Sequence, residues 1–178
     1  LLRSAHMDEV GLMITRVEDD GTLRFDSVGG IDRRVLMGKR VYVGPHRIPA
    51  VIGSKPIHLT TKEERRSVPK MTELYLDMGA ENREAAEKLV EPGDVAVFDP
   101  ECVEFGSGLL KAKAIDDRVG CAVMLELLKE EFPMDCTFAF STQEEVGTRG
   151  GFADAFSVHP EIALVVEGTT ASDIPGTP

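Results

Sequence analysis

Four short segments of this sequence carry side chains that could work together in catalysis. They are the motif His6-x-Asp8, the pairs Asp116-Asp117 and Glu144-Glu145, and the single Glu167. An imidazole with several carboxylates is a ligand set that can hold two divalent metal ions about 3.5–4 Å apart. The sequence therefore predicts metal-assisted hydrolysis, in which a water molecule becomes the nucleophile.

The spacing within two of these segments indicates different roles for neighbouring side chains. In His6-x-Asp8, the carboxylate of Asp8 can orient the imidazole through the ring nitrogen that does not bind metal. In Glu144-Glu145, one carboxylate can bind metal while the other stays free as a base that takes a proton from water.

Each segment also has an ordinary structural explanation. His6 could be a buried, hydrogen-bonded histidine, and Asp116 or Asp117 could cap the helix that follows. Glu144 and Glu145 could complement a helix dipole, and a glutamate before a glycine could be a loop residue. None of these explanations accounts for all the side chains following strand ends of one predicted sheet.

The elements that must position these side chains alternate between strand and helix. Residues 1–5, 136–141 and 162–166 are short apolar runs that predict buried strands. Residues 117–131 have apolar side chains at Val119, Val123 and Met124, the spacing of a helix that faces a core, and residues 150–156 predict a second helix. Parallel strands covered by helices bring their carboxyl ends, and the residues after them, to one edge.

Between these elements the chain changes to short β-like runs separated by turns. Residues 11–17, 22–28, 35–43, 48–52, 71–78 and 95–98 predict strands, and residues 81–89 predict a short helix. This spacing is typical of a small barrel or sandwich. We expect an α/β domain of residues 1–8 and 101–178, interrupted by an inserted β-rich domain of residues 9–100.

The motifs resemble those of the tetrahedral (TET), glutamyl-aminopeptidase-like metallopeptidases, in the family's order and over nearly the whole chain. The matching segments are His6-Met7-Asp8-Glu9-Val10-Gly11, Ala114-Ile115-Asp116-Asp117-Arg118, Gln143-Glu144-Glu145-Val146-Gly147 and Glu167-Gly168-Thr169-Thr170-Ala171. The resemblance implies an aminopeptidase with a zinc-peptidase-like sheet, parallel or mixed, covered by helices. It also implies that the inserted β-barrel mediates dimerisation.

The same resemblance implies a role for each candidate residue. His6 would bind one metal, Asp8 would support His6, and Asp116 would bridge two metals. Glu144 would be the general base and Glu145 a ligand of the second metal. Glu167 stands where the family commonly has an aspartate that binds the first metal. The expected cofactors are two divalent ions, zinc or cobalt, and the expected partners are peptides and further copies of the chain, from dimer to dodecamer.

One expected ligand has no counterpart in the sequence. The family supplies a final histidine to the second metal, and His46, His58 and His159 do not stand in that motif. The sequence also begins at Leu1 without a methionine, inside a predicted strand. We therefore expect a fragment with an incomplete second metal site and little or no peptidase activity.

Composition limits the remaining choices. The net charge of -11 disfavours nucleic acid as a partner. No apolar run approaches the ~20 residues that cross a bilayer. The three widely spaced cysteines are typical of reduced, buried thiols. We expect a cytoplasmic protein without a membrane or nucleic-acid partner.

Three other functions stay open at the level of sequence. Glu144 or Glu145 with Asp116 could form the carboxylate pair of a glycosidase, although that leaves His6 unexplained and the chain has no Trp for sugar stacking. The β-rich part could belong to a non-catalytic assembly module. A metal-dependent deacylase or carboxypeptidase could use the same group of residues.

Overall fold

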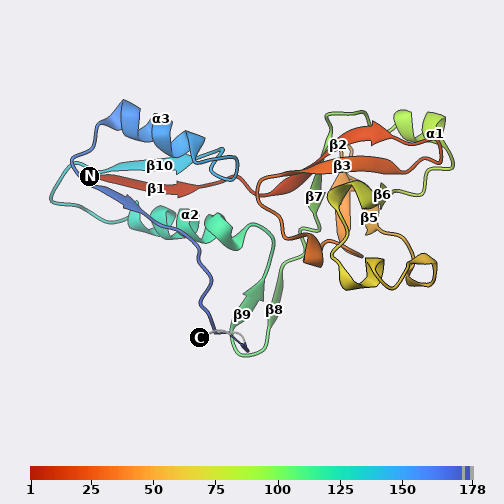
Figure 1. Ribbon diagram of the computed structural model, residues 1–178. Helices are drawn as coiled ribbons and strands as arrows, with labels where there is room; N and C mark the ends of the chain where they lie inside the picture. The colour runs from red at the N-terminus through yellow and green to blue at the C-terminus, as the bar shows by residue number, and fades with distance from the viewer. Residues whose placement is uncertain (174, 177–178) are drawn as a thin grey trace. The chain divides into compact units, whose positions relative to one another are not determined.

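The computed structural model describes residues 1–173 and 175–176, and the chain divides into two compact units (Figure 1). One consists of Leu1–Glu9 and the chain from Ala114 onward, and the other is Val10–Lys113. Residues 101–113, expected in the α/β domain, group with the second unit. In this segment β8 (Val103–Phe105) and β9 (Leu109–Lys111) pair with each other as a hairpin and not with the sheet of the first unit.

The first unit has a parallel three-stranded sheet in the order β10-β1-β11. These strands are Thr137–Ser141, Leu2–His6 and Ala163–Val165, respectively. Figure 1 shows α2 (Ile115–Leu127) and α3 (Arg149–Val158) on opposite sides of the sheet. The predicted α/β architecture, with strands connected through helices, is confirmed.

The core of the first unit lies between the sheet and one face of α2. Ala5, Cys121 and Met124 are buried there, with Phe138 and Phe140 packed against them. On α2, the 3–4 spacing of Gly120, Cys121 and Met124 places these residues on one face of the helix, and this face packs against Ala5 of β1.

Two burial expectations for this unit are wrong. On α2, Val119 and Val123 are 47% and 44% exposed, because Gly120, Cys121 and Met124 form the face that packs on the sheet. On β11, Leu164 and Val165 are exposed, because α2 packs chiefly against β1, and α3 against β10 and β1.

The second unit is a closed six-stranded barrel in the order β2-β3-β6-β5-β4-β7. Its strands are β2 (Gly11–Val17), β3 (Leu23–Val28), β4 (Arg40–Val43), β5 (Ile48–Gly53), β6 (Tyr75–Asp77) and β7 (Val95–Phe98). Side chains alternate along the strands: Leu12 and Ile14 of β2 are buried, and Met13 between them is exposed. The predicted barrel is confirmed.

Three elements of the barrel unit are shorter than the sequence predicts. The run 35–43 is a strand only from Arg40, because Asp32 caps the 3-10 helix Arg33–Val35. The run 71–78 begins with the 3-10 helix Met71–Glu73 before β6. The helix α1 spans only Arg83–Glu87, with its N-terminus capped by the side chain of Asn82. Two further 3-10 helices, Ile57–Leu59 and Glu64–Arg66, lie between β5 and β6.

The cysteines are free but not uniformly buried. Cys121 is buried, Cys136 is half-buried and Cys102 is exposed, so the expectation of three buried thiols is correct only for Cys121. Among the described residues, no helix has the length and apolar character needed to span a membrane.

Candidate metal centre

The predicted site residues meet at the carboxyl ends of the parallel strands. β1 ends at His6, Glu144 follows the end of β10, and Glu167 follows β11. The register pairs His6 with Ser141 and Ser4 with Val165, so the strand ends lie side by side. Asp116 enters the same site from the start of α2. Parallel strand direction, which the sequence pattern predicted, is therefore what gathers these residues.

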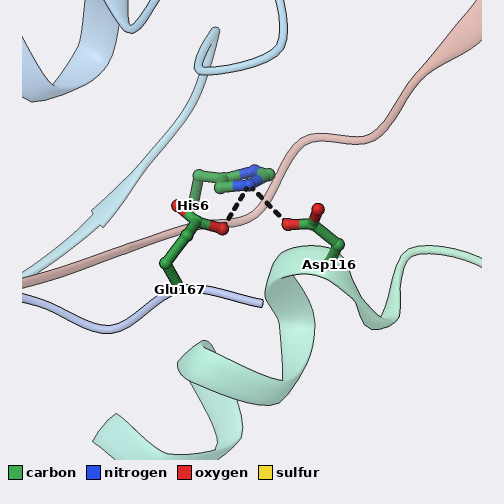
Figure 2. Close-up of side chains that lie close together, drawn as sticks. All are labelled: His6, Asp116 and Glu167. Atoms are coloured by element: carbon green, nitrogen blue, oxygen red, sulfur yellow. Dashed lines mark hydrogen bonds and ion pairs between the residues drawn. The ribbon is translucent and has the colours of Figure 1, made fainter. Parts of the chain in front are cut away.

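His6 is at the centre of this group. Its side chain is only 3% exposed, and its Nε2 atom faces three carboxylates. The Nε2 atom lies 3.3 Å from Asp116 Oδ1, 3.5 Å from Glu167 Oε1 and 3.9 Å from Glu144 Oε2. Figure 2 shows the side chains of Asp116 and Glu167 converging on this nitrogen from different elements.

Asp8 connects the imidazole to the Glu144-Glu145 pair. Its Oδ1 atom lies 3.4 Å from His6 Nδ1. The same carboxylate accepts the backbone N–H of Glu144 on Oδ1 and that of Glu145 on Oδ2, each at 3.2 Å. The sequence indicated only the first of these contacts. Asp8 therefore contacts His6 and also holds the peptide backbone that carries both glutamates.

Three side chains in this cluster, His6, Glu145 and Glu167, have pKa values raised above the ordinary ones. Burial opposes protonation of His6, but Glu167, the hydrogen bond to Asp116, Asp8 and Glu144 together raise its pKa. Burial, followed by hydrogen bonding to Asp116, raises the pKa of Glu167. Burial also raises the pKa of Glu145, opposed by the attraction of His6. A bound cation would oppose the raised pKa values of Glu145 and Glu167, because a nearby positive charge favours the ionised form of a carboxylate.

The group His6, Asp116 and Glu167 fits a divalent cation. One donor atom from each residue lies within 4.8 Å of the other two. Donors bound to tetrahedral zinc at about 2.0–2.1 Å are about 3.3 Å apart. The distances from His6 Nε2 to the nearest oxygen atoms of Asp116 and Glu167, 3.3 Å and 3.5 Å, are close to that donor–donor separation.

A second cation position has fewer donors. Glu145 is beside the cluster through its N–H bond to Asp8, but it is not part of the three-residue donor group. His46 and His58 belong to the barrel unit, and the ring of His159 packs 5.6 Å from that of Phe156. Within the described part of the chain, no second histidine joins this donor group.

Sequence reasoning gave no site role to Asp117, which it treated only as a possible helix cap. The structure places its fully buried carboxylate against the backbone of His6, with Oδ2 accepting the His6 N–H at 3.2 Å. One feature of the sequence pointed to a role in the site, because Asp117 directly follows a predicted metal ligand. This feature did not distinguish a site residue from an ordinary helix cap.

Comparison with known proteins identifies the family. The model of the M42 glutamyl aminopeptidase family matches residues 1–178. The chain belongs to the M42 glutamyl aminopeptidase family. The chain spans about half the length of the curated relatives that it matches.

Solved structures agree with the M42 assignment. An aminopeptidase from the archaeon Desulfurococcus kamchatkensis is 41% identical with a TM-score of 0.91, covering 99% of this chain and 49% of that one. The TET1 peptidase of Pyrococcus horikoshii, which can assemble into a tetrahedron or a large octahedral shell, is 36% identical with a TM-score of 0.83 over 97% of this chain and 56% of that one.

One similar structure carries a different functional description. A Thermotoga maritima protein described as an endoglucanase is 36% identical with a TM-score of 0.78, covering 98% of this chain and 50% of that one. Similarity at this level thus accompanies two different functional descriptions, and the family and the fold are what the comparisons share.

Proposed function

We propose that this chain forms part of a metal-dependent aminopeptidase that removes N-terminal residues from peptides. The observation that supports this proposal most strongly is that His6, Asp116 and Glu167 converge on one position of the size of a cation, with Glu144 beside it. Family membership supports peptide substrates, since M42 proteins are described as glutamyl aminopeptidases.

In this proposal His6, Asp116 and Glu167 hold the first divalent ion, and Asp116 with Glu145 contributes to a second. Zinc suits their nitrogen and oxygen donors, and cobalt is the alternative. Bound ions would polarise the scissile carbonyl and lower the pKa of a water molecule. The site residues are then responsible for positioning and proton transfer.

Glu144 is proposed as the general base. Its Oε2 atom lies 3.9 Å from His6 Nε2, near the donor group but outside it, and its side chain is 34% exposed. A carboxylate so placed can take a proton from water and return it to the leaving amine. Asp8 fixes this arrangement, because its carboxylate holds the backbone N–H of Glu144 and faces His6.

The test replaces Glu144 by Gln, with bound metal measured in this chain and turnover measured in a polypeptide of its relatives' length that contains it. Zinc or cobalt is supplied, aminoacyl p-nitroanilides are the substrates, and bound metal is measured by mass spectrometry. We expect Glu144→Gln to abolish turnover with nearly unchanged metal content. Loss of metal would instead make Glu144 a ligand, and unchanged turnover would overturn its role as base.

We also propose that this chain alone turns peptides over slowly or not at all. The reason is that the second metal site, beside Glu145, has few donors: among the described residues, no second histidine joins the group. Turnover by this chain with zinc or cobalt at a rate similar to that of the longer polypeptide would contradict this.

Self-association is the third part of the proposal. The TET1 peptidase of Pyrococcus horikoshii assembles into closed shells, and the barrel unit is the expected dimerisation domain. Light scattering on the longer polypeptide should give a dimer or a multiple of it. A monomer at micromolar concentration would contradict this proposal and leave the metal site unaffected.

A glycosidase is the second candidate, favoured by the relative described as an endoglucanase. It would use Glu144 or Glu145 with Asp116 and would not need the imidazole. Chelation separates the two, because EDTA should stop a metallopeptidase and spare a glycosidase that depends on carboxylates alone. Hydrolysis of β-glucans that survives EDTA would replace the proposed function.

A further inference from the structure

Asp117 is the one fully buried carboxylate among the described residues of the first unit, and it is 0% exposed. Burying a charge is costly unless hydrogen bonds compensate it. Two backbone N–H groups do so here: His6 donates to Oδ2 at 3.2 Å and Gly120 donates to Oδ1 at 3.1 Å. One carboxylate therefore connects the end of β1 with the first turn of α2.

The first turns of α2 hold the backbone around His6 at three points. Besides the bond from the His6 N–H to Asp117, the thiol of Cys121 donates to the His6 carbonyl oxygen at 3.2 Å. The Nε atom of Arg118 donates to the carbonyl oxygen of Met7 at 3.3 Å. Both polar backbone groups of His6 are thus bound by side chains from the helix that begins beside Asp116.

The Asp117 carboxylate has room because residue 120 is a glycine. A Cβ atom at Gly120 would lie 2.3 Å from Asp117 Oδ1 and 2.6 Å from Oδ2, so any larger residue would displace the carboxylate. A helix cap alone would need neither this packing nor the bond to His6, because capping requires only an oxygen near the first N–H groups of the helix.

We propose that Asp117 is a positioning residue for the metal centre. Its carboxylate fixes the His6 backbone against the start of α2 and so sets the separation of the metal-binding atoms of His6 and Asp116. This inference rests on the proposed metal site. It assigns Asp117 a role through His6 and Asp116, and not contact with the metal or the substrate.

The experiment measures zinc affinity by competition with a chromophoric chelator, with the folded fraction taken from circular dichroism. Asp117→Asn keeps size and capping ability but turns one accepting oxygen into a donor that cannot bind an N–H group. We expect zinc to bind about 10- to 100-fold more weakly, the range for residues that support metal ligands. Gly120→Ala, which leaves Asp117 itself intact, should weaken binding in the same direction.

A matched control separates positioning from stability. Met124→Ala removes a buried side chain from the same helix without touching the His6 backbone, and should leave zinc affinity per folded molecule unchanged. If Asp117→Asn does not fold, Cys121→Ala tests the same anchoring of His6 and should weaken zinc binding several-fold.

The outcomes are distinct. Zinc affinity within about twofold of wild type in folded Asp117→Asn, or in Cys121→Ala when Asp117→Asn does not fold, would overturn the positioning role. An equal loss in Met124→Ala would do the same. Failure of the wild-type chain to bind zinc would overturn the proposed function as well, so the two proposals fail by different results.

Discussion

Asp8 accepts the backbone N–H of Glu144 on the same oxygen atom, Oδ1, that lies 3.4 Å from the imidazole of His6. The other oxygen accepts the N–H of Glu145. A single carboxylate thus joins the first strand end to the loop after β10. The geometry of the site depends on this residue even though it does not face His6 Nε2.

Replacing Asp8 by Asn should therefore disturb two parts of the site at once. The amide keeps one acceptor and gains a donor that cannot accept the second N–H. We expect zinc affinity to fall about 10- to 100-fold, as for other residues that support metal ligands. Zinc titration measures the change. The control is Glu126→Gln, at an exposed residue that pairs with Lys129. Equal affinities for Asp8→Asn and Glu126→Gln would contradict the prediction.

Glu167 offers a test of ligand type. We expect Glu167→Asp to keep zinc binding within about tenfold of wild type, because a carboxylate remains available as a metal donor. Glu167→Gln removes the negative charge that zinc neutralises and should weaken binding further than Glu167→Asp does. Isothermal titration gives both constants. The reverse order would show that Glu167 acts by size and not as a charged ligand.

The pKa shifts predict how pH affects the metal-free chain. Glu167 has its pKa raised above the ordinary 4.5, chiefly by burial, so the fold binds its proton more tightly than the unfolded chain does. The resulting stabilisation is complete below pH 4.5 and is lost as pH rises through the higher pKa of the folded state. His6 has the same sign, with loss beginning above pH 6.5.

Thermal unfolding in EDTA isolates the contribution of Glu167. Wild type should lose stability relative to Glu167→Gln as pH rises from 4.5 toward neutrality. Added zinc should stabilise wild type more at higher pH, because ligands bind zinc in their deprotonated forms. A difference in Tm that stays constant across this range would contradict the shift.

The thiols provide a prediction independent of metal. Burial raises the pKa of Cys121, and its thiol donates to the His6 carbonyl, whereas Cys102 is exposed. Thiolate is the reactive form, so Cys121 should react with a thiol reagent far more slowly than Cys102. Timed alkylation with peptide mass spectrometry measures both rates. Equal rates in the folded chain would show that the first unit opens readily around α2.

The candidate site was largely predictable because parallel strands impose one edge on it. Once residues 1–5, 136–141 and 162–166 are taken as parallel strands, His6, Glu144 and Glu167 must follow the same sheet edge. The barrel was predictable from the spacing of turns and short strands. These features depend on local pattern, which a sequence displays directly.

Other features depend on contacts between residues that are far apart in the sequence, and these could not be predicted. From the sequence, Asp117 is expected to cap a helix. Its bond to His6 forms only because the start of α2 packs against the end of β1 in the fold. The helical spacing of Val119 and Val123 looks like a core face, but the glycine and cysteine of α2 pack on the sheet instead. Residues 101–113 lack a pattern that distinguishes a hairpin of the second unit from strands of the first.

The most direct measurement is an anomalous-scattering map at the zinc absorption edge, from crystals of this chain grown with zinc. We expect a peak within about 2.0–2.2 Å of His6 Nε2 and of one oxygen each from Asp116 and Glu167. We also expect Glu144 to lie outside the bonding distance of that peak. A map with no peak at this position, or with zinc bound elsewhere in the chain, would contradict the assignment of the metal centre.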